Sequence, residues 1–331
     1  MSKFWQGKRV LVTGAGGFIG SHLVERLVYE GANVRALVRY NSRGDAGLLR
    51  LIPKDIIQSV QIWAGDIRDS DAIQKAVEGS QVVFHLGALI SIPYSYQHPI
   101  EVAEVNIMGT LNMLMACTKV KVDRLIHTST SEVYGTALRV PIDEDHPLHG
   151  QSPYSASKIG ADKLCESFHC AYELPVITMR PFNTYGPRQS ARAVIPTIIT
   201  QALTQSVIRL GNLDTTRDFT FVDDTVDGFV KAAEAKDVEG KTINLGTGTE
   251  IKIGTLAEKI VSLAGSGARI ELDDTRLRPS NSEVQRLLSN NALASATLGW
   301  TPHTSLEDGL KQTIDWIKGH LNLFRIGSYE F

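Results

Sequence analysis

The spacing of hydrophobic and polar positions in the first half of the chain predicts strands that alternate with helices. Short β-branched runs are separated by longer amphipathic stretches with an apolar residue every three or four positions. The short runs predict strands at 10–12, 34–38, 60–64, 82–86, 125–128 and 176–179. The stretches between them predict helices at 17–30, 70–78, 99–119 and 155–172. Such alternation implies right-handed crossovers, so the expected fold is α/β: a Rossmann-type, doubly wound parallel sheet with helices on both faces.

The pattern changes after residue 180, where prolines interrupt the alternation. The run 242–245 is expected to return to the main sheet, and the tail from Ile253 onward is mostly helical. We therefore predict a dinucleotide-binding domain at 1–180, with a return around 223–248, and a smaller, mostly helical C-terminal substrate domain at 181–222 and 249–331.

The composition is that of a globular protein with nearly balanced charge. Hydrophobic residues make up 43% of the 331 residues, and 34 basic against 36 acidic residues leave a formal charge of -2. This balance argues against a nucleic-acid partner. The N-terminus has no apolar leader region, and we find no stretch with the roughly 18 apolar residues of a membrane span, so we expect a cytoplasmic protein without a membrane partner.

Cysteine and histidine usage gives no disulfide or metal signal. The three cysteines, Cys117, Cys165 and Cys170, form an odd and sparse set that suits reduced thiols in a reducing compartment. The nine histidines are scattered without metal-ligand spacing, so no metal site is predicted.

A glycine motif stands where the first strand meets the first helix. Gly14, Gly17 and Gly20 form the pattern G-x-x-G-x-x-G, with Phe18 and Ile19 opening the expected helix. Gly14 permits the tight turn, Gly17 lets backbone N–H groups approach a pyrophosphate, and Gly20 lets the helix pack closely on the sheet. The helix N-terminus then faces the phosphates. At a strand-to-helix junction, this motif predicts a dinucleotide site rather than a plain turn.

Residues after the second and third strands bear on which dinucleotide binds. An acidic residue after the second strand would grip the adenosine ribose of NAD, but this chain has Arg39 there, followed shortly by Ser42. A cationic residue suits the 2′-phosphate of NADP, which slightly favours NADP over NAD; alternatively, Arg39 only stacks on the adenine. Asp66 and Ile67 are expected to meet the adenine edge, although Asp66 could equally cap the next helix.

Four residues near the fifth strand and the following helix carry candidate chemistry. Tyr154 and Lys158 are four positions apart and share one helix face. We expect the Lys158 ammonium to lower the phenol pKa, which would let Tyr154 act as a general base toward a sugar hydroxyl, and Lys158 also to hold the nicotinamide ribose. Thr130 and Glu132 follow the fifth strand, at the sheet edge where ligands bind. Thr130 would hydrogen-bond the reacting hydroxyl, and Glu132 would abstract a proton, unless it is a surface or helix-capping carboxylate.

These segments resemble an extended short-chain dehydrogenase/reductase of the nucleotide-sugar epimerase/dehydratase family. The matching segments are the glycine motif, 85–88, 106–110, the Tyr154/Lys158 pair, 181–187, 217–224 and 278–279, so that nearly the whole chain is covered. The resemblance implies that Leu86, Ala88 and Asn106 also contact the cofactor. Two departures from the family pattern stand out. The usual H-L-A-A has Gly87 in its third place, and a compact Arg-Pro-Gly-Asp stretch is loosened into 278–284.

The resemblance also implies a pocket for a nucleotide sugar, and the expected contacts are Ser91, Tyr94, Asn183, Val194, Arg217 and Arg278. The asparagine and the two arginines would hold the diphosphate, because phosphates need cationic forks and a few neutral donors. The alternative for each arginine is a surface ion pair. Val194 would lie beside the base and sugar of the nucleotide. Ser91 and Tyr94, which follow the fourth strand, either line the sugar pocket or belong to an ordinary loop.

The family resemblance implies a common first step, in which Tyr154 takes the proton of the C4 hydroxyl while the C4 hydride goes to the nicotinamide. Epimerases return the hydride to the other face of the ketone and usually lack a carboxylate at the position of Glu132. In 4,6-dehydratases this carboxylate removes the C5 proton, water leaves from C6, and hydride returns to C6. The best-known dehydratases resemble this chain but carry the motif Thr-Asp-Glu at this position, whereas this chain has Thr130-Ser131-Glu132. Glu132, Ser131 or a water would then relay the proton to the leaving hydroxyl.

The Thr-Ser-Glu motif also resembles UDP-glucuronate decarboxylases, so the motif alone leaves both reactions open. The stretches 127–132, 180–196 and 276–279 look most like the soluble UDP-N-acetylglucosamine 4,6-dehydratases of the legionaminic-acid type. We therefore expect an NAD(P)-dependent lyase that converts UDP-N-acetylglucosamine to a UDP-4-keto-6-deoxy sugar. The alternatives are a UDP-glucuronate decarboxylase, a UDP-sugar 4-epimerase and, in a different class, a non-catalytic NAD(P)-binding sensor.

The two longest expected helices, 99–119 and 155–172, carry apolar residues at helical spacing. These residues are Met108, Leu111, Met113, Leu114, Met115, Leu164 and Phe168. Such a stripe is usually core. In relatives, however, these helices also pair across a two-fold axis into a four-helix bundle, and the resemblance thus implies a C2 homodimer.

Overall fold

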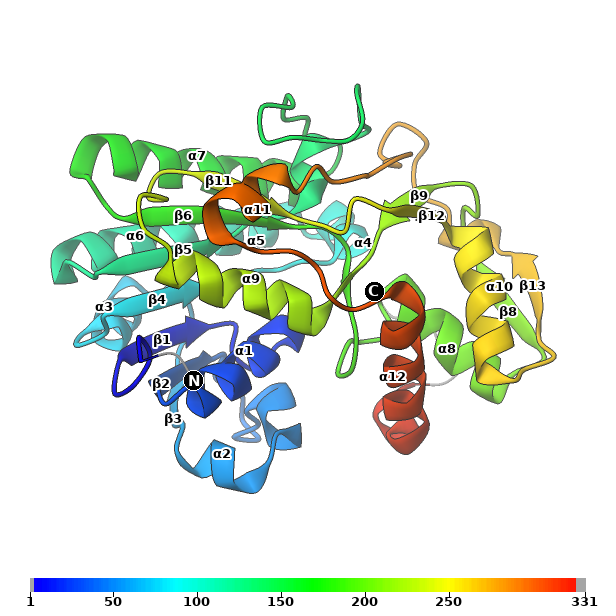
Figure 1. Ribbon diagram of the computed structural model, residues 1–331, viewed down its shortest axis with the longest axis horizontal. Helices are drawn as coiled ribbons and strands as arrows, with labels where there is room; N and C mark the ends of the chain where they lie inside the picture. Colours follow the sequence, from blue (N-terminus) through cyan, green and yellow to red (C-terminus); the bar gives the residue numbers. More distant parts are fainter. Residues whose placement is uncertain (1–2, 326–331) are drawn as a thin grey trace.

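The computed structural model describes residues 3–325, and its main element is a seven-stranded parallel sheet (Figure 1). The strands are β1 (Arg9–Thr13), β2 (Asn33–Val38), β3 (Gln61–Ala64), β4 (Val82–His85), β5 (Arg124–Thr128), β6 (Val176–Pro181) and β11 (Thr242–Leu245). Their order in the sheet is β11-β6-β5-β4-β1-β2-β3. All six predicted strands are present, and the run 242–245 returns beside β6. The predicted Rossmann-type fold is therefore confirmed.

Helices cover both faces of the sheet (Figure 1). One layer contains α3 (Ser70–Val77), α6 (Gly109–Val120) and α7 (Pro153–Tyr172), and the other contains α1 (Phe18–Tyr29) and α9 (Val222–Glu234). Strand side chains alternate between the layers: Leu11 and Val83 join the core under the first, Val12 and Phe84 the core under the second. Burial on both faces produces the continuous apolar runs from which the strands were predicted.

The strand order reverses between β1 and β4. From this point β2 and β3 extend to one side, and β4, β5, β6 and β11 extend to the other. Loops leaving the carboxyl ends of two strands diverge at such a reversal, and the crevice between them is where open α/β sheets bind ligands. The glycine motif after β1 and the segment after β4 meet there.

The structure contains one helical stretch with the apolar length of a membrane span, which the sequence was expected to lack. The stretch Pro99–Val120 is long and apolar enough to cross a membrane by length and composition. It consists of α5 (Pro99–Ala103), a π-helical turn (Glu104–Met108) and α6. Part of it packs against α3 and α7 in the helix layer. This packing accounts for much of its apolar character, as in a core helix.

A second group of elements forms the region drawn on the right of Figure 1. Three helices pack together there: α8 (Val194–Thr204), α10 (Ile253–Ala264) and α12 (Leu306–Gly319). Three two-stranded sheets accompany them, made by β8 (Val207–Leu210) with β13 (Arg269–Leu272), β9 (Thr216–Asp218) with β12 (Glu250–Lys252), and β7 (Thr184–Tyr185) with β10 (Thr220–Phe221). The helices were predicted, whereas the small sheets were not.

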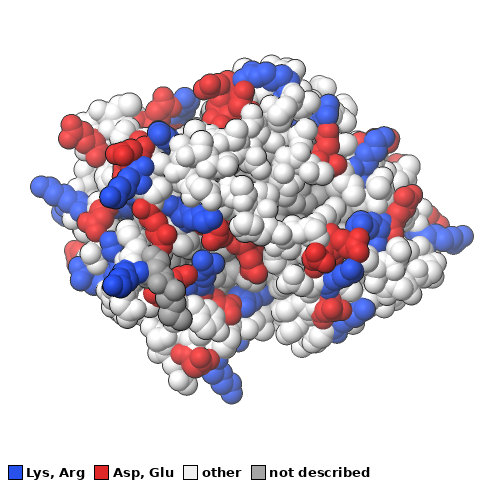
Figure 2. All heavy atoms as spheres, in the orientation of Figure 1, with Lys and Arg blue, Asp and Glu red and all other residues white. Residues whose placement is uncertain are grey.

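The shorter helices complete the chain: α2 (Lys54–Gln58), α4 (Ile92–Gln97) and α11 (Ala292–Leu298). On the face shown in Figure 2, basic and acidic side chains are interspersed around a central area without charged groups. This mixing agrees with the small net charge of -2, and no large patch of a single sign is visible on this face.

Candidate active site

The turn from β1 into α1 has the geometry of a dinucleotide cradle. Gly14 has a φ of +65°, and a Cβ there would lie 2.8 Å from the Leu86 carbonyl carbon. A Cβ on Gly20 would lie 2.2 Å from the Gly14 carbonyl oxygen. Gly17 is the N-cap of α1 and offers no side chain to the free N–H groups of the first turn. These residues fit a pyrophosphate held by backbone N–H groups at a helix N-terminus.

The segment after β4 closes the cradle from the other side. The Thr13 hydroxyl accepts a hydrogen bond from the Gly87 N–H at 3.0 Å and contacts His85 Nδ1 at 2.9 Å. A Cβ on Gly87 would lie 3.1 Å from the Thr13 hydroxyl oxygen. The departure from H-L-A-A therefore lies where the ends of β1 and β4 approach each other closely. The missing side chain of Gly87 leaves room for the Thr13 hydroxyl.

Asn106 supports this segment from behind. Its amide donates to the Leu89 carbonyl and to the Ser157 hydroxyl, both at 2.9 Å, and its Oδ1 accepts from the Leu89 N–H at 2.8 Å. The side chain is buried. Its hydrogen bonds thus join the β4 loop to α7, and the cofactor contact that the resemblance implied for Asn106 stays a prediction.

The residues predicted to choose between NAD and NADP lie at the ends of β2 and β3. Arg39 and Ser42 are exposed. Asp66 accepts a 2.7 Å hydrogen bond from Arg68, and this bond, with the charge of Arg39 as a smaller cause, lowers the pKa of Asp66. The cap of α3 is Asp69, which accepts from the N–H groups of its first turn. The alternative in which Asp66 caps this helix is therefore wrong.

Tyr154 and Lys158 lie together in the first turns of α7 and are both buried. The helix begins at a capping box in which Ser152 and Ser155 bond each other's backbone N–H groups. The Lys158 ammonium donates to the Thr128 carbonyl at 2.7 Å, which ties it to the end of β5. The predicted pair is thus held at the carboxyl edge of the sheet.

The phenol pKa departs from the expected direction. Burial raises the pKa of Tyr154, a hydrogen bond with Thr130 lowers it, and the charge of Glu132 raises it further. Burial also lowers the pKa of Lys158. The expected depression of the phenol pKa by the ammonium is therefore wrong for this state of the site, because desolvation outweighs it. In this state Thr130 hydrogen-bonds the Tyr154 phenol, and its predicted contact with the reacting hydroxyl of a substrate stays a prediction.

A buried ion pair lies one turn beyond Lys158, and the sequence analysis missed it. Asp162 accepts from Arg180 Nη2 at 2.9 Å, from the Ser129 hydroxyl at 2.8 Å and from His127 Nε2 at 3.3 Å. It thereby joins α7 to β5 and β6. The signal was available in the spacing, since position 162 continues the face defined by 154 and 158.

Glu132 is in a short 3-10 turn after β5 (Ser131–Tyr134). Thr130 caps this turn by accepting from the Glu132 N–H at 3.2 Å. The Glu132 side chain lines a pocket, and its charge acts on both Tyr154 and Arg217. Ser131 is buried and is not among the lining residues. Glu132 is therefore a wall group of the pocket and not a surface or capping carboxylate.

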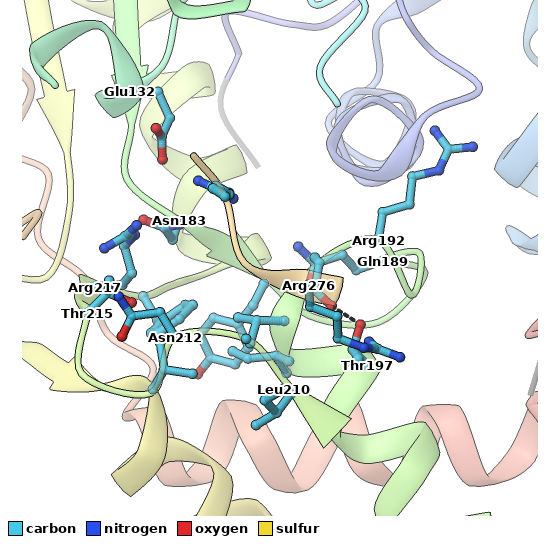
Figure 3. A pocket seen from close by; sticks show the side chains of 18 of the residues that line it. Glu132, Asn183, Gln189, Arg192, Thr197, Leu210, Asn212, Thr215, Arg217 and Arg276 are labelled. Atoms are coloured by element: carbon cyan, nitrogen blue, oxygen red, sulfur yellow. Dashed lines mark hydrogen bonds between the residues drawn. The ribbon is translucent and has the colours of Figure 1, made fainter. Parts of the chain in front are cut away.

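The pocket has a volume of about 260 Å³ and brings together five predicted residues (Figure 3). They are Glu132, Asn183, Val194, Arg217 and Arg278. The other two predicted substrate residues do not line it: Ser91 caps α4, and the Tyr94 hydroxyl donates to Glu101 at 2.5 Å. Several further lining residues had no role predicted from the sequence: Gln189, Arg192, Thr197, Arg276 and Glu283.

The pocket is built for an anion. Four arginines line it, at 192, 217, 276 and 278, against two glutamates, at 132 and 283. Glu283 Oε1 lies 3.5 Å from Arg217 Nη2 and 3.7 Å from Arg278 Nη1. Asn183 Oδ1 and Arg278 Nη1 are buried without a hydrogen-bond partner. Figure 3 shows Asn183 and Arg217 together, with the carboxylate of Glu132 directed toward them.

Comparisons with known proteins show the family of the chain. The family model described as GDP-mannose 4,6 dehydratase matches residues 11–313. A UDP-glucose 4-epimerase of Mycolicibacterium smegmatis is 34% identical over 94% of this chain and 98% of its own. The human dTDP-D-glucose 4,6-dehydratase is 31% identical over 94% of this chain and 90% of its own.

Two solved structures are similar over nearly the whole fold. One is the UDP-glucuronic acid 4-epimerase from Bacillus cereus in complex with UDP-glucuronic acid and NAD, with a TM-score of 0.85, 30% identity, and coverage of 94% of this chain and 99% of the other. The second is a dTDP-glucose 4,6-dehydratase from Streptomyces venezuelae with NAD bound, with a TM-score of 0.86, 28% identity, and coverage of 96% and 98%.

The fold, the glycine cradle and the Tyr154/Lys158 pair define an extended short-chain dehydrogenase/reductase. The chain belongs to the GDP-mannose 4,6 dehydratase family and is an enzyme of this nucleotide-sugar dehydratase and epimerase group. The expected family membership is thus confirmed.

Proposed function

We propose that the protein is a nucleotide-sugar 4,6-dehydratase that converts UDP-N-acetylglucosamine to a UDP-4-keto-6-deoxy sugar. The observation that carries this proposal is the position of Glu132. Its carboxylate lines the pocket and lies near enough to Tyr154 to affect the phenol pKa. A sugar whose C4 hydroxyl meets Tyr154 therefore has a candidate base for its C5 proton next to it.

The proposed first step is an oxidation at C4. Tyr154 takes the proton of the C4 hydroxyl, and Thr130, its hydrogen-bond partner, orients that hydroxyl. A nicotinamide dinucleotide, when bound, supplies the acceptor for the C4 hydride and the donor of the hydride that returns to C6. Lys158, anchored on the Thr128 carbonyl one helical turn after Tyr154, would favour the deprotonated phenol that this step needs. The 4-ketone that forms acidifies the hydrogen on C5.

The proposed elimination then uses Glu132 twice. The carboxylate removes the C5 proton and passes it to the C6 hydroxyl, so that the C6–O bond breaks and water leaves. After hydride returns to C6, a solvent proton delivered through Glu132 completes C5. Ser131 is buried away from the pocket lining. We therefore assign the proton relay to Glu132, the member of Thr130-Ser131-Glu132 that reaches the pocket.

The nucleotide is proposed to occupy the arginine-lined part of the pocket. Arg217 and Arg278 would bind the diphosphate, and Asn183 would donate its amide N–H to a phosphate oxygen. Val194 would border the base and the ribose. A uridine nucleotide is favoured because the B. cereus neighbour binds UDP-glucuronic acid.

For the cofactor we propose NADP over NAD, since Arg39 is an exposed cation at the end of β2 and can meet a 2′-phosphate. The two neighbouring structures described above contain NAD. Denaturing the purified protein and identifying the released dinucleotide by mass spectrometry decides between them. Release of NAD alone would reject the role of Arg39.

A UDP-sugar 4-epimerase is the second candidate function. The M. smegmatis relative is named a UDP-glucose 4-epimerase and is 34% identical over 94% of this chain. An epimerase needs Tyr154, Lys158 and the cofactor but has no use for a base at C5. The carboxylate of Glu132 on the pocket wall is thus the feature that separates the two candidates.

Product analysis by mass spectrometry tests the proposal. The protein is incubated separately with UDP-N-acetylglucosamine, UDP-glucose and UDP-glucuronate. We expect a product from UDP-N-acetylglucosamine that is lighter by one water and carries a ketone. Formation of UDP-N-acetylgalactosamine without a mass change would establish the epimerase instead, and loss of carbon dioxide from UDP-glucuronate would establish the decarboxylase.

We also propose a C2 homodimer. Ile100, Met108 and Met115 are exposed along α5, the π-helical turn and α6, with exposed fractions of 74%, 48% and 59%. An apolar stripe of this kind on a helix that already packs against its own sheet favours a second copy as its partner. Three free cysteines, two of them buried, further suit the reducing cytoplasm.

A further inference from the structure

Glu283 is a carboxylate inside a pocket that is otherwise suited to an anion. Its Oε1 lies between the guanidinium groups of Arg217 and Arg278, at 3.5 and 3.7 Å. The Glu283 side chain is 13% exposed, so water screens these charges only partly. A substrate diphosphate would need the same two guanidinium groups. Glu283 and the diphosphate are therefore competitors for one site.

The contacts of Glu283 are long for charged hydrogen bonds, which usually measure about 2.7–2.9 Å. Arg278 Nη1 has no hydrogen-bond partner, although it is buried. The carboxylate thus neutralises the two arginines by proximity while leaving the Arg278 Nη1 donor unsatisfied. A diphosphate with several acceptor oxygens could satisfy this donor, and the exchange would break no strong bond.

The backbone around Glu283 is fixed. The Ser282 hydroxyl donates to the Gln151 carbonyl at 2.6 Å and contacts the Tyr96 hydroxyl at 2.6 Å. On the other side, the Gln285 carbonyl accepts from the Thr216 N–H at 3.0 Å. Any displacement of the carboxylate must come from rotation of its side chain. Its negative charge therefore stays near the phosphate site even after a ligand binds.

We propose that Glu283 is a resident counter-ion of the diphosphate site: it occupies the Arg217/Arg278 fork when the pocket is empty, yields the fork to the diphosphate, and weakens nucleotide binding by its remaining charge. This inference rests on the proposed binding of a nucleoside-diphosphate sugar. Glu283 is a positioning residue, since it acts through the two arginines. Its function is to keep two like-charged groups in place while leaving the nucleotide able to dissociate.

The test is the affinity of the full-length protein for UDP, measured by isothermal titration calorimetry for wild type and for Glu283→Gln. The substitution removes one negative charge and keeps the shape. We expect the dissociation constant of UDP to fall by about five- to tenfold, the size of one partly screened charge near the phosphates. The gain should shrink at high salt. In turnover assays KM should fall by a similar factor while kcat does not rise.

Three variants control for structural effects. Glu283→Asp keeps the charge and should bind UDP as wild type does, within about a factor of two. Glu283→Ala removes the charge without leaving an amide to be satisfied and should tighten binding as Glu283→Gln does. Glu250→Gln makes the same charge change at an ion pair with Arg286 that does not line the pocket, and should leave UDP affinity unchanged.

Unchanged or weaker UDP binding in both neutral variants would overturn the counter-ion role. Equal tightening in Glu283→Asp would also overturn it, because the effect would then not come from charge. These failures are distinct from failure of the proposed function. If wild type does not bind UDP at all, the nucleotide assignment is wrong, whereas normal UDP binding without the Glu283 effect removes only the present inference.

Discussion

At the residue scale, burial decides the protonation of the groups behind Tyr154 and Lys158. The ring of His127 is enclosed between Asp162 and the sheet, and its Nε2 lies 3.3 Å from that carboxylate. Burial, assisted by the charge of Lys158, lowers the pKa of His127 to about 4 despite the opposing effect of Asp162. The ring is therefore neutral in the folded protein at neutral pH.

This shift predicts acid sensitivity. The unfolded chain binds a proton at His127 near pH 6.5, and the folded chain does so only near pH 4. The neutral ring therefore contributes its full stabilisation of the folded state above pH 6.5. As the pH falls toward 4 this contribution is lost, and the free energy of unfolding falls by on the order of 3 kcal/mol. Urea unfolding at pH 7 and pH 4.5 measures this fall.

The matched variants are His127→Gln and His303→Gln, the second at an exposed histidine. The first should flatten the fall in unfolding free energy between these pH values, and the second should not. An identical pH dependence in wild type and His127→Gln would show that the buried ring does not control acid stability.

At the scale of elements, the β1–α1 turn depends on the lack of a side chain at Gly20. A Cβ there would meet the Gly14 carbonyl oxygen at 2.2 Å, so either α1 or the glycine turn must move. Gly20→Ala should therefore cost about 1–3 kcal/mol of stability and weaken dinucleotide binding by tenfold or more. Thermal unfolding and titration with NADP and NAD measure the two effects.

Gly319→Ala is the matched control, because a Cβ at Gly319 meets nothing within 4 Å. It should change neither property. Normal dinucleotide affinity in Gly20→Ala would mean that the tight packing of α1 on the turn is not needed for the cofactor.

Elements with a clear period could be predicted from the sequence, and those without one could not. The strands of the main sheet are buried on both faces and read as apolar runs, and α7 carries a helical repeat across its length. By contrast, β7 and β10 have two residues each and pair between positions 184–185 and 220–221. Two residues define no periodicity, so this pairing depends on tertiary structure.

The same reasoning applies to the site. Tyr154, Lys158 and Glu132 were predictable because they stand in short motifs at the edge of the sheet. Glu283 was not assigned, since its segment departs from the compact family stretch and reaches the pocket only through its hydrogen bonds to distant positions such as Gln151. A pocket assembled from separate segments leaves little trace in the local order of residues.

At the scale of the whole molecule, the exposed stripe on α5 and α6 predicts self-association. Sedimentation velocity at micromolar concentration should show a dimer for wild type and a monomer for Met115→Glu, because a charge in the apolar contact would be buried without a partner. The control is Leu272→Glu, at a leucine on β13 that is exposed to a similar extent as Met115. This variant should remain a dimer. A wild-type monomer would contradict the proposed assembly.

The whole molecule combines a glycine turn that fits a dinucleotide with a pocket that suits an anion, and Glu132 lines this pocket near enough to Tyr154 to affect the phenol pKa. The central claim is that this carboxylate moves the C5 proton of the sugar. The reaction in deuterium oxide, followed by NMR of the product, tests it most directly. Wild type should give a dehydrated product with deuterium at C5, and Glu132→Gln should slowly accumulate reduced cofactor without losing water, whereas Glu166→Gln, at an exposed position on α7, should behave as wild type. Retention of the original hydrogen at C5, or wild-type turnover by Glu132→Gln, would contradict the account.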